Sequence, residues 1–166
     1  MHFTKKLLFL FIFSGYFIIY AQESKVKEVL NIFTFEEVEE LHQKKPKPIL
    51  IFIYTDWCKI CYGMKKTTFK NKKVIQLLNE KFYFIKLNAE EKQNITFLGK
   101  IFTFKPTGTN TGMHELAVEL GTIKKTITYP TTIILNTLFE IDAQLTGLYN
   151  ANKMIRIMTT YINQSS

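Results

Sequence analysis

The longest apolar runs of the chain predict buried β-strands. Residues 49–55 (ILIFIYT) and 82–88 (FYFIKLN) are rich in β-branched and aromatic residues, a pattern typical of strands covered on both faces. Residues 129–147 (YPTTIILNTLFEIDAQLTG) predict two further strands joined by a tight turn near Asn136. Together with a shorter stretch at residues 27–33 (KEVLNIF), these runs predict a sheet whose middle strands are buried.

Helical patterns alternate with these strands. Residues 34–37 (TFEE) form a capping box that opens a helix through about Lys45, and prolines follow directly. Residues 58–69 and 71–82 predict one helix or two in succession, and a last helix runs from about residue 150 to 162. The apolar face of this last helix contains Met154, Ile157, Met158 and Tyr161. The alternation predicts an α/β fold with a central mixed β-sheet flanked by helices.

Between residues 89 and 128 the pattern is weaker. Residues 94–104 (NITFLGKIFTF) alternate only weakly, and residues 105–112 (KPTGTNTG) are rich in turn formers. Residues 113–121 (MHELAVELG) predict a short amphipathic helix that ends at Gly121. We interpret 89–128 as an insertion that either shapes a substrate surface or covers an edge of the sheet.

The first 21 residues differ in character from the rest. A basic head, MHFTKK, precedes the uncharged run LLFLFIFSGYFIIY at residues 7–20. A membrane-spanning helix needs about 20 apolar residues, whereas the apolar core of a signal peptide has about 7–15. The sequence therefore predicts a signal peptide at residues 1–21, cleaved after Ala21, and an exported domain at residues 22–166. An uncleaved membrane anchor is the alternative.

Composition adds little to this picture. The 166 residues suit one domain, and the formal net charge is +8. The lysines are spread along the chain, and no run of them is interleaved with aromatic residues in a nucleic-acid-binding motif. We interpret them as a solvated basic surface, with no nucleic-acid partner, on a protein that we expect to be a monomer.

Both cysteines of the chain lie in the segment YTDWCKIC at residues 54–61, directly after a predicted strand. Thiols at positions i and i+3 of a helix face the same side and can close a disulfide. If Cys58 begins the helix, the unpaired backbone N–H groups and the helix dipole stabilise its thiolate, and Lys59 adds to that effect. Cys58 is therefore the predicted attacking cysteine. Cys61, one turn further in and more buried, is the predicted resolving cysteine.

Other uses of a C-x-x-C pair fit this sequence less well. Haem attachment needs a histidine after the second cysteine, where this chain has Tyr62. Structural zinc needs four ligands, yet the predicted mature chain adds only His42 and His114, without ligand spacing. A purely structural disulfide across one helical turn constrains little of the chain. We expect a redox-active pair without metal or cofactor, and we interpret both histidines as solvated or capping residues.

The cysteine segment resembles the W-C-x-x-C active site of the thioredoxin superfamily. The longer run YTDWCKICYGMKKTTFKNKKVI, which includes Asp56 and Trp57, resembles more closely a periplasmic branch. That branch contains the C-terminal thioredoxin-like domain of thiol:disulfide interchange proteins. Tyr129-Pro130-Thr131 is similar to the cis-proline loop of the superfamily, which implies that Pro130 presents the substrate backbone. The resemblance covers residues 27–163, apart from the insertion.

Two positions bear on proton transfer. Thioredoxins carry a buried carboxylate six positions before the first cysteine, where this chain has Phe52. The buried lysine that accompanies it in the superfamily is matched by Lys86. Without the carboxylate, we expect Cys61 to lose its proton slowly and mixed disulfides to be long-lived.

The resemblance implies a thiol:disulfide oxidoreductase of the bacterial periplasm that exchanges disulfides with protein thiols. We expect Trp57 to flatten the surface beside the cysteines. The resemblance favours a reductase supplied by a membrane electron-donor protein. The alternative is a thioredoxin-fold binding or chaperone module whose insertion holds a partner, with little redox turnover.

Overall fold

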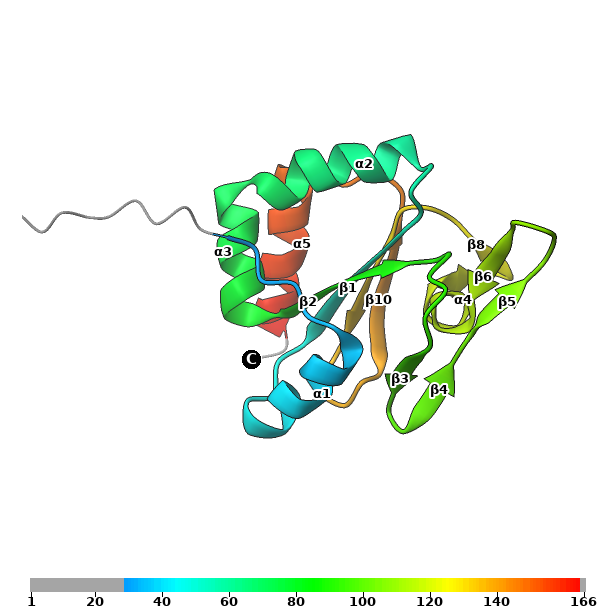
Figure 1. Ribbon diagram of the computed structural model, residues 1–166. Coiled ribbons are helices and arrows are strands. Elements are labelled where there is room, and N and C mark those ends of the chain that lie inside the picture. Colours follow the sequence, from blue (N-terminus) through cyan, green and yellow to red (C-terminus); the bar gives the residue numbers. More distant parts are fainter. Residues whose placement is uncertain (1–28, 165–166) are drawn as a thin grey trace, which may run out of the picture.

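A mixed four-stranded sheet forms the centre of the computed structural model, which describes residues 29–164 (Figure 1). Its strands are β1 (Ile49–Tyr54), β2 (Tyr83–Asn88), β9 (Thr131–Leu135) and β10 (Ile141–Thr146). They lie in the order β10-β9-β1-β2, with β1 parallel to β2 and antiparallel to β9. The predicted central mixed sheet is therefore confirmed.

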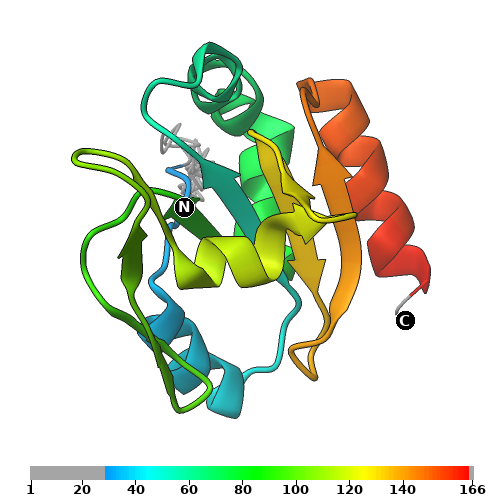
Figure 2. The same ribbon diagram turned by 90° about the vertical axis from the view of Figure 1, so that its right-hand side faces the viewer.

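Helices cover both faces of this sheet. They are α1 (Phe35–Lys44), α2 (Lys59–Lys66), α3 (Lys72–Lys81), α4 (Glu115–Gly121) and α5 (Ala151–Gln164), with a short 3₁₀ helix η1 (Thr68–Lys70). Helices α2, α3 and α5 pack on one face, and α1 and α4 on the other (Figures 1 and 2). Residues 49–53 of β1 are fully buried because both layers close over the strand.

Local signals set the helix boundaries as predicted. Thr34 caps α1 through a capping box with Glu37. The segment that predicted one helix or two forms α2 and α3, with η1 between them. The side chain of Asn71 accepts hydrogen bonds from the backbone N–H groups of Lys73 and Val74, which begins a new helix there.

The predicted first strand is wrong within the described residues. Of residues 29–33, only Phe33 joins the sheet, through a single bridge to Ile85. The backbone before Phe33 binds the side chain of Asn79 on α3 instead. Asn79 accepts a hydrogen bond from Asn31 N–H and donates one to the Val29 carbonyl. These bonds draw the chain towards α3, and β2 is left as an edge strand. The predicted signal peptide lies outside the described residues.

Three small hairpins and α4 make up the insertion. The strands are β3 (Ile95–Phe97), β4 (Lys100–Phe102), β5 (Phe104–Pro106), β6 (Gly112–His114), β7 (Thr122–Ile123) and β8 (Thr126–Ile127). They pair two by two, and none of them joins the central sheet. Helix α4 lies across one face of that sheet (Figure 2), where Leu116 and Ala117 enter the core shared with α1. Within residues 29–164, no helix has the length and apolar character needed to cross a membrane.

Candidate redox site

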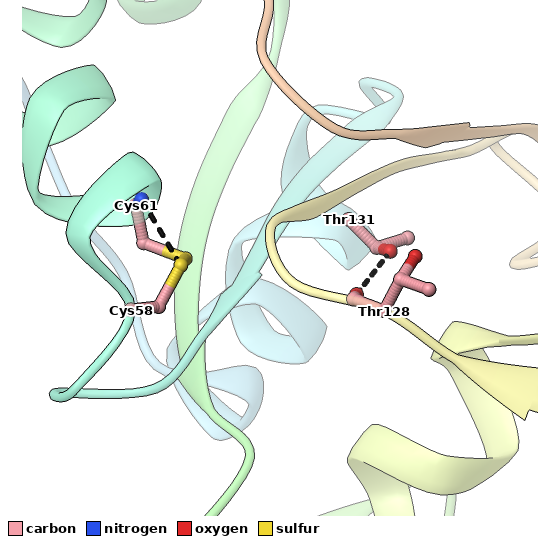
Figure 3. The surroundings of a disulfide bond; sticks show 4 residues. All are labelled: Cys58, Cys61, Thr128 and Thr131. Atoms are coloured by element: carbon pink, nitrogen blue, oxygen red, sulfur yellow. Dashed lines mark hydrogen bonds between the residues drawn. A yellow bond between two sulfur atoms is a disulfide. The ribbon is translucent and has the colours of Figure 1, made fainter.

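The two cysteines lie where β1 passes into α2. After Tyr54 a short turn follows, in which Cys58 N–H donates to the Thr55 carbonyl. Cys58 is the N-cap of α2, and its Sγ accepts a hydrogen bond from Cys61 N–H at 3.1 Å (Figure 3). The two residues form a disulfide with their Cα atoms 5.2 Å apart. The predicted placement of Cys58 at the start of a helix is confirmed.

Their exposure differs in the direction that their predicted roles require. Cys58 keeps 7% of its surface exposed, and Cys61 is fully buried at 0%. An incoming sulfur atom therefore has access to Cys58 first. The helix N-terminus adds backbone N–H groups and a positive dipole end beside the same sulfur atom, which favours its thiolate.

The loop before β9 lies across from the disulfide (Figure 3). Its Tyr129–Pro130 peptide bond is cis, as expected from the sequence. Thr131 Oγ1 donates to the Thr128 carbonyl at 2.7 Å, and Gly147 N–H donates to the Pro130 carbonyl at 2.8 Å. These two bonds hold the loop in place. The role of Pro130 in presenting a substrate backbone stays a prediction.

Trp57 lies on the surface beside the disulfide, 66% exposed. Its indole Nε1–H donates to the Glu90 carboxylate at 3.1 Å, and its ring meets Tyr129 edge-on at 5.9 Å between centroids. Tyr129 in turn donates its hydroxyl to Met113 Sδ at 3.5 Å. Burial raises the pKa of Tyr129, and the nearby Glu90 raises it further, so the hydroxyl stays protonated as a donor.

Sequence reasoning missed Glu90 and Met113. Glu90 is 33 positions from Trp57, and nothing in the sequence pairs the two. The available signal was its position just beyond the end of β2, because the ends of adjacent parallel strands meet at the same edge of a sheet. Asp56 lies at that edge too, and it accepts a hydrogen bond from Asn88 Nδ2 at 3.0 Å. Lys59 is exposed on the first turn of α2.

The expected burial of Lys86 is wrong. Phe52 is fully buried and packs against Phe69 at 4.8 Å between ring centroids. Lys86 lies next to Phe52 in the register of β1 and β2, but its side chain is exposed, whereas its neighbours Ile85 and Leu87 on β2 are buried. Partial burial lowers the pKa of Lys86, and the ammonium groups of Lys65 and Lys70 lower it further. Lys86 is therefore part of a surface group of lysines.

The interpretation of the histidines as solvated is also wrong, since both are buried. His114 does cap α4: its Nδ1 accepts from Leu116 N–H at 3.3 Å, and its Nε2 lies 3.2 Å from the Gln93 carbonyl. His42 Nε2 lies 3.0 Å from the Thr137 carbonyl in the turn between β9 and β10. Both histidines connect separate segments of the chain. Residues 29–164 contain no cluster of three or more histidine, cysteine or acidic side chains suited to a metal ion.

The chain has relatives of known family and fold. A protein-family model described as "Thioredox_DsbH: Protein of unknown function, DUF255" matches residues 20–138, which include both cysteines and Pro130. No curated protein matches the sequence significantly.

Among solved structures, a thioredoxin from Thermus thermophilus is similar with a TM-score of 0.56 and 16% identity, over 80% of this chain and 87% of that one. A putative disulphide isomerase from Bacteroides thetaiotaomicron gives 0.54 and 20%, over 81% and 92% of the two chains. The reduced DsbD C-terminal domain of Neisseria meningitidis gives 0.50 and 17%, over 75% and 90%. These similarities confirm the predicted thioredoxin-like fold.

Proposed function

The chain belongs to the DsbH-like thioredoxin family, and on that basis we propose that it is an exported thiol:disulfide oxidoreductase acting on proteins. The observation that supports this proposal best is the cysteine pair itself. Cys58 caps α2, accepts a hydrogen bond from Cys61 N–H and is the more exposed of the two sulfur atoms. This arrangement favours a nucleophilic thiolate at an accessible position.

The reaction proceeds by two exchanges. In the reduced protein the Cys58 thiolate attacks one sulfur atom of a substrate disulfide, and the other substrate sulfur leaves as a thiolate. The Cys61 thiolate then attacks Cys58 Sγ and displaces the second substrate thiolate. The substrate gains two electrons and becomes a dithiol, and the protein is left with the Cys58–Cys61 disulfide. No further cofactor takes part in either step.

Cys61 must lose its proton before the second exchange. It is fully buried, and burial disfavours the charged thiolate. Position 52, where thioredoxins carry a carboxylate, holds a buried phenylalanine here, and Lys86 is on the surface. The second exchange is accordingly the slow one.

The surroundings of the pair support a role for protein substrates. Trp57 is exposed next to Cys58 and contacts Tyr129. The 128–131 loop, which contains Tyr129, lies across from the disulfide (Figure 3). We assign Tyr129 and Pro130 to substrate docking, Asp56 to the turn that leads to Cys58, and Lys59 to support of the Cys58 thiolate. The direction is reduction, with electrons supplied by a membrane protein, and the compartment is the periplasm. Residues 1–21 are the signal peptide, and residues 22–166 form the domain.

Reduction of insulin disulfides in the presence of a dithiol donor tests the activity. The protein should accelerate precipitation of the insulin B chain, and Cys58→Ser should abolish the acceleration. Cys61→Ser should leave Cys58 reactive and accumulate a mixed disulfide that is visible on non-reducing gels. An unmodified protein without turnover would favour the binding-module alternative, and equal trapping by both variants would reverse the assigned roles.

Export is tested separately by mass spectrometry of protein recovered from an exporting host. The mature chain should begin at Gln22 or within a few residues of it. Recovery of an intact Met1 in a soluble cytosolic fraction would contradict both the signal peptide and the compartment.

A further inference from the structure

The helices that follow Cys58 carry a concentrated positive charge. From Lys59 to Asn79 the sequence contains six lysines and no aspartate or glutamate. These residues form α2, η1 and most of α3, which lie together on one side of the central sheet (Figure 1). We define the basic face by five lysines: Lys59, Lys65, Lys66, Lys70 and Lys86. These five lysines are spread from position 59 to position 86 in the sequence, and the fold brings Lys86 close to Lys65 and Lys70.

The charges of the basic face are close enough to influence one another. Besides partial burial, the neighbouring ammonium groups of Lys65 and Lys70 lower the pKa of Lys86. Both ion pairs found within residues 29–164 lie in the insertion, where Lys100 binds Glu119 and Lys105 binds Glu115. Within the described residues no lysine of the basic face is in either ion pair, so these charges are available to a partner.

Aromatic rings position two of these lysines. Lys65 Nζ lies 4.1 Å from the ring centroid of Tyr54, and Lys66 Nζ lies 5.5 Å from that of Tyr62. Such cation–π contacts restrict a side chain without removing its charge. The two ammonium groups are therefore held close to the protein surface, and their side chains move less freely.

Large apolar side chains are exposed on the same helix, α2. Ile60 is 51% and Tyr62 58% exposed on α2, next to Trp57 on the preceding turn. A helix that only faces water gains nothing from exposing large apolar groups, whereas a protein interface combines them with charges around its edge. The composition of this surface fits a protein partner.

Negative charge is found at the ends of β1 and β2, next to the basic face. Asp56, Glu90 and Glu91 lie where β1 and β2 end, and Glu90 binds Trp57. Asp56 and Glu91 both act on the phenol of Tyr54, whose pKa burial raises first and these carboxylates raise further. Lys65 lies against the same Tyr54 ring, so these carboxylates mark the border of the basic face, and an acidic partner is attracted to α2 beyond that border.

We propose that the basic face, with Ile60 and Tyr62, is the docking surface for an acidic protein that exchanges its disulfide with Cys58. This inference rests on the proposed function, because docking there serves to bring a partner cysteine to the start of α2. Opposite charge on the partner accelerates association and orients the two proteins, and both effects weaken with added salt.

The test uses three synthetic disulfide-linked peptides that differ only in the residues around the cysteine, which are acidic, uncharged or basic. Stopped-flow fluorescence gives the second-order rate constant of each peptide with the reduced full-length protein. At about 0.01 M salt, where charges act over roughly 30 Å, the acidic peptide should react about tenfold faster than the uncharged one. At about 1 M salt the preference should disappear.

Charge-reversal variants locate the effect. In the double variant Lys65→Glu/Lys70→Glu, the acidic peptide should react no faster than the uncharged peptide, or more slowly. The control Lys124→Glu/Lys125→Glu, in the turn between β7 and β8, changes the net charge equally and should keep the ratio. Because each ratio is taken within one variant, a change in the reactivity of Cys58 cancels.

Three outcomes would overturn the proposal. The first is equal rates for the acidic and basic peptides at low salt. The second is that the control Lys124→Glu/Lys125→Glu loses its preference for the acidic peptide as much as Lys65→Glu/Lys70→Glu does. The third is binding of the basic face to phosphatidylserine vesicles without any difference in rate among the peptides. The last outcome would assign the basic face to a membrane surface. Reduction of uncharged 2-hydroxyethyl disulfide by the unmodified protein tests the proposed function independently, since this probe cannot sense the basic face.

Discussion

Residues 49–53 of β1 are fully buried side by side, whereas each strand of the insertion has only two or three residues and leaves at least one side chain exposed or half-buried. The insertion buries fewer side chains, among them Phe97, Phe102 and Leu116, and polar contacts add to this packing. Glu115 accepts hydrogen bonds from the backbone N–H and the hydroxyl of Thr103 and pairs with Lys105 at 3.2 Å. Gln144 on β10 donates to the Leu120 carbonyl at the end of α4.

The difference indicates that the two regions respond to different changes. Burial in the central sheet is shared by many side chains, so damage there spreads through the whole domain. A hydrogen bond in the insertion acts between two groups, and its loss opens a local segment. The redox site draws on both regions. Cys58 follows strand β1 of the central sheet, and Met113 of the insertion accepts a hydrogen bond from Tyr129.

The largest expected effect comes from the sheet. Phe52→Ala should lower the free energy of unfolding by about 3–5 kcal/mol, because it removes a buried ring and leaves a cavity. The control Ile101→Ala, on the exposed face of β4, should change it by no more than about 0.5 kcal/mol. Urea unfolding followed by circular dichroism gives both values. Similar losses for the two variants would remove the distinction between the regions.

A polar group placed in the sheet core should alter the chemistry. Phe52→Asp supplies a proton acceptor for Cys61 and should accelerate the second exchange by roughly 100-fold, near the lower end for general-base catalysis. Phe52→Asn serves as the control, because the asparagine side chain has nearly the same shape as aspartate but cannot accept the proton. Fluorescence of Trp57, the single tryptophan, follows the two exchanges in variants first shown to be folded. Equal rates for Asp and Asn would mean that proton acceptance does not limit the second exchange.

In the insertion, His114→Ala should have a smaller and local effect. It removes the imidazole contacts with Leu116 N–H and the Gln93 carbonyl. The loss of two hydrogen bonds should lower the free energy of unfolding by about 2 kcal/mol. Hydrogen exchange should rise over residues 93–116 and stay unchanged in β1 and β9. The matched control His42→Ala should raise exchange in the turn near Thr137 instead. Uniformly faster exchange in the His114 variant would show that the insertion does not open separately.

The smallest effect concerns pH. Hydrogen bonds from the Thr103 backbone and from Lys105 lower the pKa of Glu115 below its ordinary value of 4.5. A carboxylate with a lowered pKa contributes stability above its ordinary pKa and loses that contribution as the pH falls through the lowered one. The difference in melting temperature between the unmodified protein and Glu115→Gln should therefore shrink below about pH 4.5. A difference that stays constant down to about pH 2 would contradict a stabilising role for this carboxylate.

Much of the fold and the cysteine site followed from local sequence. The strands β1, β2, β9 and β10 are apolar or alternating runs of residues that lie next to one another in the chain, so their pattern is visible without tertiary contacts. Thr34 caps α1 through Glu37, three positions away, and Cys58 caps α2 in the same local way. The placement of the cysteine pair was predictable because it depends on a spacing of three residues and on a helix start.

Tertiary structure decided the features that depend on distant residues. Asn79 draws residues 29 and 31 towards α3, and β2 is left as an edge strand. Packing of the insertion buries His114 and brings Glu90 to Trp57 across 33 positions. The sequence by itself determined which segments form strands and helices and where the cysteines stand, because burial periodicity and capping act within a few residues. Which side chains then meet, and which lysines share one face beside the disulfide, depends on how those elements pack, and packing is set by the whole chain at once.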